Sequence, residues 1–583
     1  MKWTDGPSGK NHPGMITSRL RSGRAAAGVA AAVVLASLLI PSAEASESAA
    51  AAAVPDYPPV GSVFPLGDGS APKSGMTQLS SGVTYRVYSQ GTAANDGWAV
   101  WVRYPDGQEM TTVAATATAY AQKLRDAGFP AEAVPLASPA TTDTYAMTLY
   151  GVHVGPYGTA AAAANTRTQL KAAGYPSTRT FFTAETNPDS TGPWQIRVIT
   201  VAPGADVDVR TEHGTDVSTS QTVKQMATAS GALAAVNGSE FDIASPNNPA
   251  FMGYEGVPQG LYVRNNVLLG APNNGRTALL LNTAGGGHRI TETTSRTWVS
   301  VPGKGERDVD GVNRVAGQIL GCGGVGGDFR EFADGPKPWS DPVRNGTCYD
   351  PDEIVVFRPE WGAATPQPAK KWAGAAVTEV VMNGNWEVLS VRHAPGPIPA
   401  GGRVLQGIGL GGAWLASLTP GEKVTPRTTI TDPSGASVTS PAFSAVGGGT
   451  PALLRDGEIM LNPAANGMAH ASCVLPAPAS GCRPSGVLTS RHARTLAGIS
   501  ADGHLMLVTI DGRNPAYSVG VTLPEAAKVM RWLGARDAVG LGSGGDTTMV
   551  VGGSLYNRPW DEWGDTALRE RPMSNAVVVV PSS

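Results

Sequence analysis

Charged side chains are scarce in this sequence. Asp, Glu, Lys and Arg make up 16% of its 583 residues, and 44 basic residues against 47 acidic ones leave a net charge of −3. A protein that binds nucleic acid needs an excess of Lys and Arg on one surface to neutralise phosphates. The near-balance of charge gives no sign of such a surface, so we expect no nucleic-acid partner.

Long apolar runs are also missing, with one exception near the N-terminus. The stretch AAAGVAAAVVLASLLI at 25–40 follows three arginines within 19–24 and precedes the small-x-small sequence Ala-Glu-Ala at 43–45. These are the parts of a secretory signal. We expect residues 1–45 to be a signal peptide, which leaves a secreted or wall-associated protein with no membrane contact after cleavage. The alternative is an uncleaved anchor, although the run is short for a spanning helix.

Cysteine is rare, with four residues in the chain. No C-x-x-C pair and no nearby histidine pair supports zinc, the alternative use of these cysteines. An exported protein with an even number of cysteines is expected to form disulfides. Cys473 and Cys482 flank the loop VLPAPASG, and Cys322 and Cys348 flank another irregular segment. We therefore predict these two local bridges, and no metal or cofactor.

Glycine and proline, in contrast, are abundant, with 73 and 46 residues. They favour many turns and short strands over helical bundles. Residues 46–80 are rich in Ala, Ser, Pro and Gly without a clear pattern and are predicted to be a flexible linker. From residue 204 onward the sequence changes to short alternating segments around N-G and D-G turns, such as LRDGEIML and ISADGHLMLVTI, which predict β-hairpins.

One helix stands out in this hairpin-rich part. The sequence T-L-P-E at 522–525 is a capping box, and the apolar residues that follow share one face as far as Gly534. The strand DAVGL comes next and leads into GSGGDTT at 542–548. We expect this glycine loop to lie at the end of a strand that the helix covers.

Residues 81–203 contain a repeated strand–helix pattern. The alternating segment WAVWVRY at 98–104 precedes an Ala-rich run that ends in LRDAGFP, and YAMTLYGVHVG at 145–155 precedes a run that ends in LKAAGYP. In each run a glycine supplies the left-handed position after the helix, and proline prevents its continuation. We expect a third strand, PWQIRVITV, to close the unit at Val201.

This pattern resembles the SPOR domain, a module that binds the glycan strands of peptidoglycan. The segment VGPYGTAAAAANTRTQLKAAGY at 154–175 carries the resemblance. It implies peptidoglycan as a partner, and Trp98, Trp101 and Tyr150 are the aromatic side chains that we expect to stack on sugar rings. The alternative is a small α+β packing module in which these rings form the core.

The C-terminal part resembles the phosphodiester glycosidase family. The stretch HARTLAGISADGHLMLVTIDGRNPAYSVGVTLPEAAKVMRWLGARDAVGLGSGGDTTMVVGG at 492–553 carries most of the resemblance, and AAVNGSEFD, VPQGLYVRNNVLL, GVNRVAG, PALLRDGEI and ERPMSNAVVVV follow the family pattern in order. The resemblance covers residues 204–583 and implies a β-rich α+β domain. The whole chain is thus predicted to be α+β, with SPOR-like strand–helix repeats before the glycosidase domain.

What the resemblance implies about activity is hydrolysis of the glycosidic bond in a sugar-1-phosphodiester. The family pattern L-D-G-G-G-S reads Leu541-Gly542-Ser543-Gly544-Gly545-Asp546 in this chain. The family aspartate is therefore replaced by Gly542, and a new carboxylate, Asp546, stands four residues later. Asp546 either takes over the role of the missing aspartate or marks a protein that has lost catalysis.

Such a reaction needs groups that hold the phosphate charge and a carboxylate beside the cationic sugar. The candidates for phosphate are Arg494, Arg513 and Arg314, and the candidate catalytic carboxylates are Asp511, Asp546 and Glu240. The candidates for sugar hydroxyls or phosphate oxygens are Asn237, Asn313, Thr547 and Thr548, beside Gly544 and Gly545, which leave the approach open.

Each candidate also has a structural interpretation, such as a hairpin turn for Asp511, an ion pair for Arg494 and a strand-ending turn for Asn237. For the whole protein the sequence predicts an exported hydrolase that acts on a wall or extracellular glycan. Two alternatives stay open, namely a wall-glycan-binding protein without catalysis and a factor in exopolysaccharide assembly.

Overall fold

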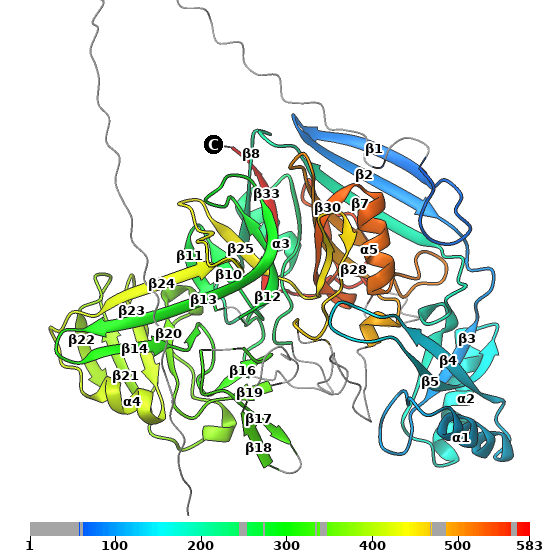
Figure 1. The fold of residues 1–583 in the computed structure, drawn as a ribbon, viewed down its shortest axis with the longest axis horizontal. Helices are drawn as coiled ribbons and strands as arrows, with labels where there is room; N and C mark the ends of the chain where they lie inside the picture. Colours follow the sequence, from blue (N-terminus) through cyan, green and yellow to red (C-terminus); the bar gives the residue numbers. More distant parts are fainter. Residues whose placement is uncertain are drawn as a thin grey trace, which may run out of the picture. The chain divides into compact units, whose positions relative to one another are not determined.

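Figure 1 shows the computed structural model of the chain, which describes residues 58, 62–243, 253–271, 274–323, 325–332, 335–338, 347–466, 468, 486–560 and 568–582. The predicted signal peptide and the predicted Cys473–Cys482 bridge lie outside these residues. The described part is rich in strands, and its five α-helices are α1 (Ala114–Asp126), α2 (Ala160–Ala172), α3 (Val223–Ser230), α4 (Gly409–Ala416) and α5 (Leu523–Trp532). The prediction of a β-rich α+β fold is confirmed. Within the described residues, no helix combines the length and apolarity that crossing a membrane requires.

The largest sheet has eight strands in the order β1-β2-β7-β29-β28-β30-β26-β27. Their bounds are β1 Lys73–Ser80, β2 Val83–Gln90, β7 Trp194–Val201, β29 Leu505–Ile510, β28 Arg494–Ser500, β30 Ala535–Ser543, β26 Ala452–Arg455 and β27 Glu458–Ile459. The D-G turns at 456–457 and 502–503 join antiparallel neighbours, as their sequences predict. Helix α5 begins at the predicted capping box of Thr522 and Glu525 and packs on β26 and β30 (Figure 1).

The N-terminal strands of this sheet differ from the sequence-based expectation. Residues 73–80, within the segment expected to be a linker, form β1, and Phe64 is buried against Trp194 and Trp532. The strand at 194–201, expected to close the strand–helix repeat, lies between β2 and β29 instead. The sequence does not predict this arrangement, because the apolar residues of a strand that is buried on both faces do not indicate which strands pair with it. The boundaries at 80 and 203 stay predictions.

A second sheet has the order β4-β5-β3-β6. Its strands are β3 Trp98–Val102, β4 Ala131–Ser138, β5 Met147–Tyr157 and β6 Thr178–Phe182. Helices α1 and α2 pack on one face of it, where Val100, Val102, Leu124 and Leu170 form a common core (Figure 1). Both helices end as predicted, because Gly128 and Gly174 adopt φ values of 90° and 92°.

One aromatic expectation in this sheet was wrong. The Trp101 side chain is 1% exposed, its ring packs on Phe181 and His153, and its Nε1 donates to the carbonyl oxygen of Glu109. Trp101 is therefore a core residue and offers no platform for a sugar. Trp98 and Tyr150 are half-buried and pack against the core on the helix side of the sheet.

The remaining strands form four further sheets. One has the order β32-β31-β9-β33-β8, with β8 Val207–His213, β9 Ala234–Asn237, β31 Met549–Val551, β32 Ser554–Leu555 and β33 Asn575–Pro581. Another has the order β11-β10-β25-β12-β13-β14 with β24 beside β13, where the bounds are β10 Tyr262–Arg264, β11 Val267–Gly270, β12 Arg276–Leu281, β13 Arg289–Val301, β14 Gly305–Val309, β24 Thr425–Thr431 and β25 Ser444–Gly447.

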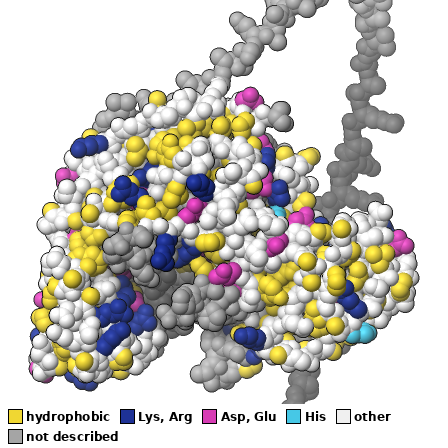
Figure 2. Space-filling view, turned by 180° about the vertical axis from the view of Figure 1, so that it is seen from behind, with side chains coloured by type: hydrophobic (Ala, Val, Ile, Leu, Met, Phe, Trp, Pro, Cys, Tyr) yellow, Lys and Arg dark blue, Asp and Glu magenta, His cyan; other side chains and the backbone are white. Residues whose placement is uncertain are grey.

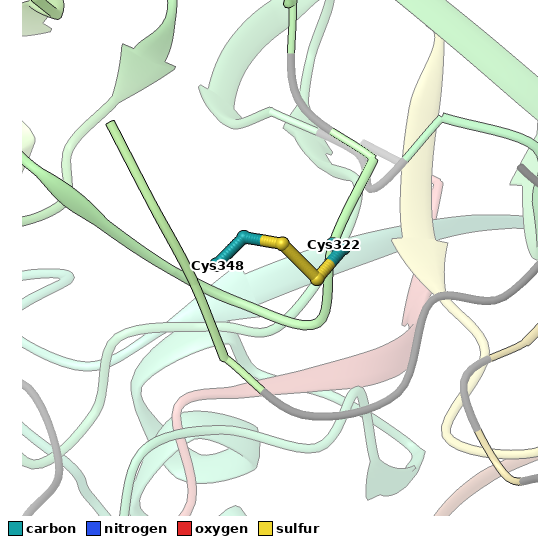
Figure 3. Close-up of a disulfide and its surroundings, with 2 residues drawn as sticks. All are labelled: Cys322 and Cys348. Carbon is teal, nitrogen blue, oxygen red and sulfur yellow. A yellow bond between two sulfur atoms is a disulfide. The ribbon is translucent and has the colours of Figure 1, made fainter. Parts of the chain in front are cut away.

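The third of these sheets has the order β15-β20-β23-β21-β22, with β15 Gly311–Val312, β20 Ile354–Phe357, β21 Thr378–Met382, β22 Val388–Arg392 and β23 Arg403–Gly407. The fourth has the order β16-β19-β17-β18, with β16 Gln318–Leu320, β17 Phe329–Phe332, β18 Gly335–Pro338 and β19 Thr347–Tyr349. The predicted Cys322–Cys348 bridge is confirmed and joins β19 to the segment after β16, with its two Cα atoms 5.2 Å apart (Figure 3).

The surface shows the scarcity of charge that the composition indicates. On the face drawn in Figure 2, Lys and Arg side chains lie in small separate groups among polar and apolar atoms, and Asp and Glu side chains lie between them. No broad basic area covers the described atoms of this face.

Candidate active site

The glycine loop lies where the expected strand ends. Strand β30 runs to Ser543, and the short 3₁₀ helix η6 (Gly544–Asp546) turns the chain into β31. Arg494 begins β28 and lies opposite Ser543 in the sheet. The loop, the start of β28 and the end of β9 thus meet at one edge of two sheets, and most of the predicted site residues come from these three segments.

Asn237 at the end of β9 ties these segments together. Its Nδ2 donates to the carbonyl oxygen of Gly542 over 2.9 Å, and its Oδ1 accepts hydrogen bonds from Thr548 N over 3.0 Å and from Thr495 Oγ1 over 2.5 Å. The side chain is completely buried. With these contacts Asn237 fixes the position of the loop rather than facing a ligand with its oxygen.

Asp546 lies beside the position where the family pattern has an aspartate. A Cβ atom built on Gly542 would lie 3.1 Å from Asp546 Oδ2 and 3.0 Å from Asn237 Nδ2. Asp546 is 7% exposed, and its Oδ1 accepts a hydrogen bond from Arg571 Nη1 over 2.7 Å. The carboxylate of residue 546 therefore occupies space that a side chain at 542 would enter.

Glu240 is the second carboxylate of this region. A Cβ atom on Gly449 would lie 2.9 Å from Glu240 Cγ, so the glycine makes room for this side chain. Burial, opposed by the charges of Arg276 and Arg494 and aided by the negative charge of Asp546, raises the pKa of Glu240 to about 7. A carboxyl group with such a pKa can exchange a proton near neutral pH.

Arg494 is buried without a carboxylate partner among the described residues. Its side chain is 1% exposed, and its hydrogen bonds to the carbonyl oxygens of Val521 and Val487 and to Ser543 Oγ are long, at 3.3, 3.5 and 3.3 Å. Burial lowers the pKa of Arg494 to about 10. An arginine buried with so little compensation is costly, and an anionic ligand would supply the missing charge.

Arg513 and His492 lie next to the loop. Arg513 Nη2 is 3.4 Å from His492 Nδ1, and a Cβ atom on Gly544 would lie 3.0 Å from the same Nη2. Burial and the charges of Arg513 and Arg494 hold the pKa of His492 well below its usual range. The imidazole is therefore neutral, accepts at Nδ1 and carries its proton on Nε2, where it can donate to a ligand.

Two hydroxyl groups complete the loop. Thr547 and Thr548 are completely buried, and neither Oγ1 has a hydrogen-bond partner among the described residues. Gly544 and Gly545 are buried beside them. Buried hydroxyls without partners are rare, and here they lie next to the carboxylate of Asp546.

Two family models match the chain. Residues 376–580 match the model described as phosphodiester glycosidase, and residues 112–179 match the model of the SPOR domain. Each match covers one part of the chain. The resemblances that the sequence suggested are thereby confirmed. The phosphodiester glycosidase match begins at residue 376, well after residue 204, where the resemblance was expected to start.

One solved structure is similar to this chain over almost its whole length. A protein of Burkholderia pseudomallei K96243 that is thought to be exported shares 28% identity, over 91% of this chain and 100% of its own, with a TM-score of 0.74. A hypothetical protein from Synechocystis shares 16% identity, over 87% of this chain and 76% of its own, with a TM-score of 0.47. No curated protein matches the chain significantly.

The catalytic domain of zebrafish N-acetylglucosamine-1-phosphodiester alpha-N-acetylglucosaminidase, auto-inhibited by its pro-peptide, is also among the similar structures. It shares 14% identity, over 68% of this chain and 80% of its own, with a TM-score of 0.28.

Within the glycosidase domain, Asp511 is engaged on both carboxylate oxygens. Oδ2 pairs with Arg197 of β7, and Oδ1 accepts hydrogen bonds from Asn557 Nδ2 over 3.1 Å and from the Arg558 amide over 3.0 Å. Burial raises the pKa of Asp511, and Arg197 opposes the shift. Asn557 also donates a hydrogen bond to the carbonyl oxygen of Thr547. Asp511 therefore helps to hold the glycine loop in place through Asn557.

Asn313 and Arg314 lie away from this site as far as the described contacts show. Asn313 Oδ1 accepts from the Arg358 amide, and Arg314 forms a forked ion pair with Glu353, with Nη1 to Oε2 at 2.7 Å and Nη2 to Oε1 at 2.5 Å. These contacts lie at β15 and β20, and no described contact joins them to the loop. The guanidinium of Arg314 is occupied by a carboxylate within the protein.

One cluster of carboxylates could hold a cation. The oxygens of Asp328, Asp350 and Glu353, all buried, lie within 4.8 Å of one another near the disulfide. Glu353 is already paired with Arg314.

Three residues of the site were missed by the sequence analysis. His492 could have been found, because positions two apart on a strand point to the same side and it precedes Arg494 by two. Arg571 and Arg276 carry no local signal, since they come from the irregular segment before β33 and from β12.

Proposed function

We propose that this chain is an extracytoplasmic hydrolase that cleaves the glycosidic bond of a sugar-1-phosphodiester. The observation that carries the proposal is the Asp546 carboxylate, 3.1 Å from the Cβ position of the residue that replaces the family aspartate. The glycosidase match at 376–580 and the exported relative support the reaction class and the location.

Arg494, Arg513 and His492 form the proposed phosphate site. The phosphodiester is a weakly basic leaving group, so departure needs charge stabilisation more than strong acid catalysis. Two guanidinium groups can each fork to phosphate oxygens, and Nε2 of a neutral His492 adds a further donor. The cost of keeping Arg494 buried without a carboxylate is then offset when substrate binds.

Asp546 and Glu240 divide the remaining work. The Asp546 carboxylate, paired with Arg571, stabilises the positive charge that develops on the sugar. Glu240, whose pKa is raised to about 7, accepts a proton from the attacking water. Two carboxyl groups in different environments are the usual way for a glycosidase to separate these roles.

Asn237 and Asp511 are positioning residues in this proposal. Asn237 holds Gly542 and Thr548, and Asp511 holds Asn557, which binds the loop at Thr547. Thr547 and Thr548 offer their free hydroxyls to the ligand. Rigid support of this kind keeps the reacting groups aligned.

The SPOR domain gives the enzyme its place of action. SPOR domains bind peptidoglycan, so residues 112–179 would hold the chain at the cell wall. The substrate is then a wall or extracellular glycan linked through a sugar-1-phosphate.

The competing function is glycan binding without catalysis, and the glycine at 542 favours it. The test is release of free sugar from a UDP-sugar by the purified mature chain. Sugar release above the spontaneous rate supports the hydrolase, whereas its absence, with glycan binding retained, supports the binding protein.

A further inference from the structure

Two adjoining hollows run from the sheet β4-β5-β3-β6 (the SPOR sheet, since β4 and β5 lie within the SPOR match) to the first turns of helix α5. The first has a volume of about 530 Å³ and lies on the sheet β4-β5-β3-β6, where Ala99, Val134 and His153 line it. Ala99 belongs to the core on the face opposite α1 and α2, since Val100 and Val102 belong to the core shared with the helices. The hollow is therefore on the face that the helices leave uncovered.

The lining of the first hollow suits a neutral, hydroxyl-rich ligand. It contains Glu132, Asn95 and the half-buried ring of Tyr157, and no Lys or Arg lines it. The Asp96 carboxylate, also in the lining, accepts hydrogen bonds from Thr183, Asn187 and Ser190. His153 is 8% exposed, and its Nε2 has no hydrogen-bond partner among the described residues. A buried ring nitrogen without a partner calls for a ligand group or a water molecule, and carboxylates next to amides bind sugar hydroxyls.

The second hollow continues from the first. Its volume is about 320 Å³, and both hollows are lined by Pro135, Thr186, Asn187 and Pro188. On its far side stand Thr522, Glu525 and Lys528 at the start of α5. The second hollow thus lies between the SPOR sheet and the helix that covers β30, the strand that delivers the glycine loop.

Arg491 forms the wall of the second hollow and fixes its two sides. Its Nη1 donates to the carbonyl oxygens of Ala184 and Asn187, each over 2.6 Å, and its Nη2 pairs with Glu525 over 2.6 Å. The next residue is His492, and consecutive Cα atoms are about 3.8 Å apart. The positive charge of Arg179, on the SPOR sheet, also helps to lower the pKa of His492. The groove formed by the two hollows is therefore walled by a residue that directly precedes His492 of the proposed phosphate site.

We propose that a single glycan chain lies along both hollows while its sugar-1-phosphodiester unit is presented at His492 and Arg494. The inference rests on the proposed function for the identity of the reaction. Beyond the proposed function, the inference is that the substrate is a polymer and that the SPOR domain and the glycosidase domain bind it together. A small sugar-1-phosphodiester would use the catalytic end alone.

A matched pair of tryptophan variants tests the groove. Thr186 is half-buried and lines both hollows, whereas Thr118 is exposed on α1 and lines neither. Thr186→Trp should fill the junction, and Thr118→Trp adds the same ring elsewhere in the SPOR domain. Both full-length mature variants are assayed on a UDP-sugar and on wall glycan carrying a sugar-1-phosphodiester. Their retention of soluble peptidoglycan glycan strands is measured in parallel.

The groove predicts that Thr186→Trp lowers kcat/KM on the polymer and the retention of glycan strands by about tenfold or more, with UDP-sugar hydrolysis unchanged. Thr118→Trp should leave all three values at the wild-type level. Equal polymer activity and equal retention in both variants would overturn the groove, even if the hydrolase is real. If the wild type hydrolyses neither substrate, the proposed function fails, and the retention assay still decides whether the groove binds glycan.

Discussion

Asp546 Oδ2 lies 3.1 Å from the point that a Cβ atom on Gly542 would occupy. The two positions are four residues apart, yet the 3₁₀ turn of η6 brings the later side chain back over the earlier backbone. A carboxylate lost at the end of β30 can therefore be supplied again from the far side of the loop, with Arg571 holding it in place.

Asp546→Asn keeps the shape of the side chain and removes its charge. We expect turnover to fall by about a hundredfold, or about 2.7 kcal/mol of transition-state stabilisation, with little change in melting temperature. Steady-state release of sugar from a UDP-sugar measures the effect. Asp456→Asn, which weakens an exposed ion pair with Arg536, is the control and should leave turnover unchanged.

Arg513→Lys replaces a fork by a point charge beside Gly544. We expect KM for a sugar-1-phosphodiester to rise by about tenfold and kcat to change less, because the ground state and the transition state share the phosphate contact. Arg531→Lys on the exposed side of α5 is the matched control. A variant with unchanged KM would remove Arg513 from the phosphate site.

Glu240 should give a pH dependence to both activity and stability. As a base with a pKa of about 7, it predicts kcat/KM that rises with pH through about 7, and Glu240→Gln should lower it strongly. The folded-state pKa exceeds the ordinary value of 4.5, so the folded protein binds this proton more tightly than the unfolded chain. The stability that this tighter proton binding gives the folded protein is present at low pH and is lost as pH rises from about 4.5 to about 7.

The measurement for this prediction is melting temperature against pH for the wild type and Glu240→Gln. The wild-type value should fall relative to the variant across the stated window. Parallel curves would show that Glu240 titrates at its ordinary pKa and would weaken its assignment as the base.

The predicted disulfides leave no cysteine reduced. A thiol assay on the denatured, unreduced secreted protein should detect no free thiol, and two or more would contradict the pairing. Replacing Cys322 and Cys348 together by Ala should lower stability by about 2–4 kcal/mol, since the bridge closes a loop in the unfolded chain. Denaturant unfolding measures this difference.

Truncation should reveal how far the large sheet depends on its N-terminal strands. A chain that starts at residue 204 lacks β2 and β7, so β29 loses its partner strand and the Arg197 charge that balances buried Asp511. We expect such a chain to aggregate, while a chain that starts at residue 62 should stay folded and monodisperse. A folded 204–583 fragment would instead support a domain boundary at residue 203.

Features with a local cause were predictable from the sequence. The helix end at Gly128, the capping box at Thr522 and the hairpin turn at 502–503 each depend on residues within a few positions. The partners of β7 were not predictable, because they lie far away in the sequence. Arg314 illustrates the same limit at the site, since its charge is used by Glu353, a residue that no spacing rule connects to it.

The structure brings some of the predicted site residues together and leaves others apart. Arg494, Arg513, Asp546 and Glu240 come together around the glycine loop, whereas Asn313 and Arg314 show no contact with it. Asp511 looked like a catalytic carboxylate because it precedes a glycine and an arginine, but Arg197 and Asn557 occupy its oxygens. Burial and the geometry of long-range contacts decide such roles, and both follow from tertiary structure.

The most direct test of the account exchanges the two carboxylate positions. Sugar release is measured for the wild type, for Asp546→Ser, and for Asp546→Ser combined with Gly542→Asp, which restores the aspartate and serine of the family pattern. The account predicts a loss of about a hundredfold in the single variant and recovery to within about tenfold of the wild type in the double variant. A fully active Asp546→Ser variant, or an inactive wild type beside an active double variant, would contradict it.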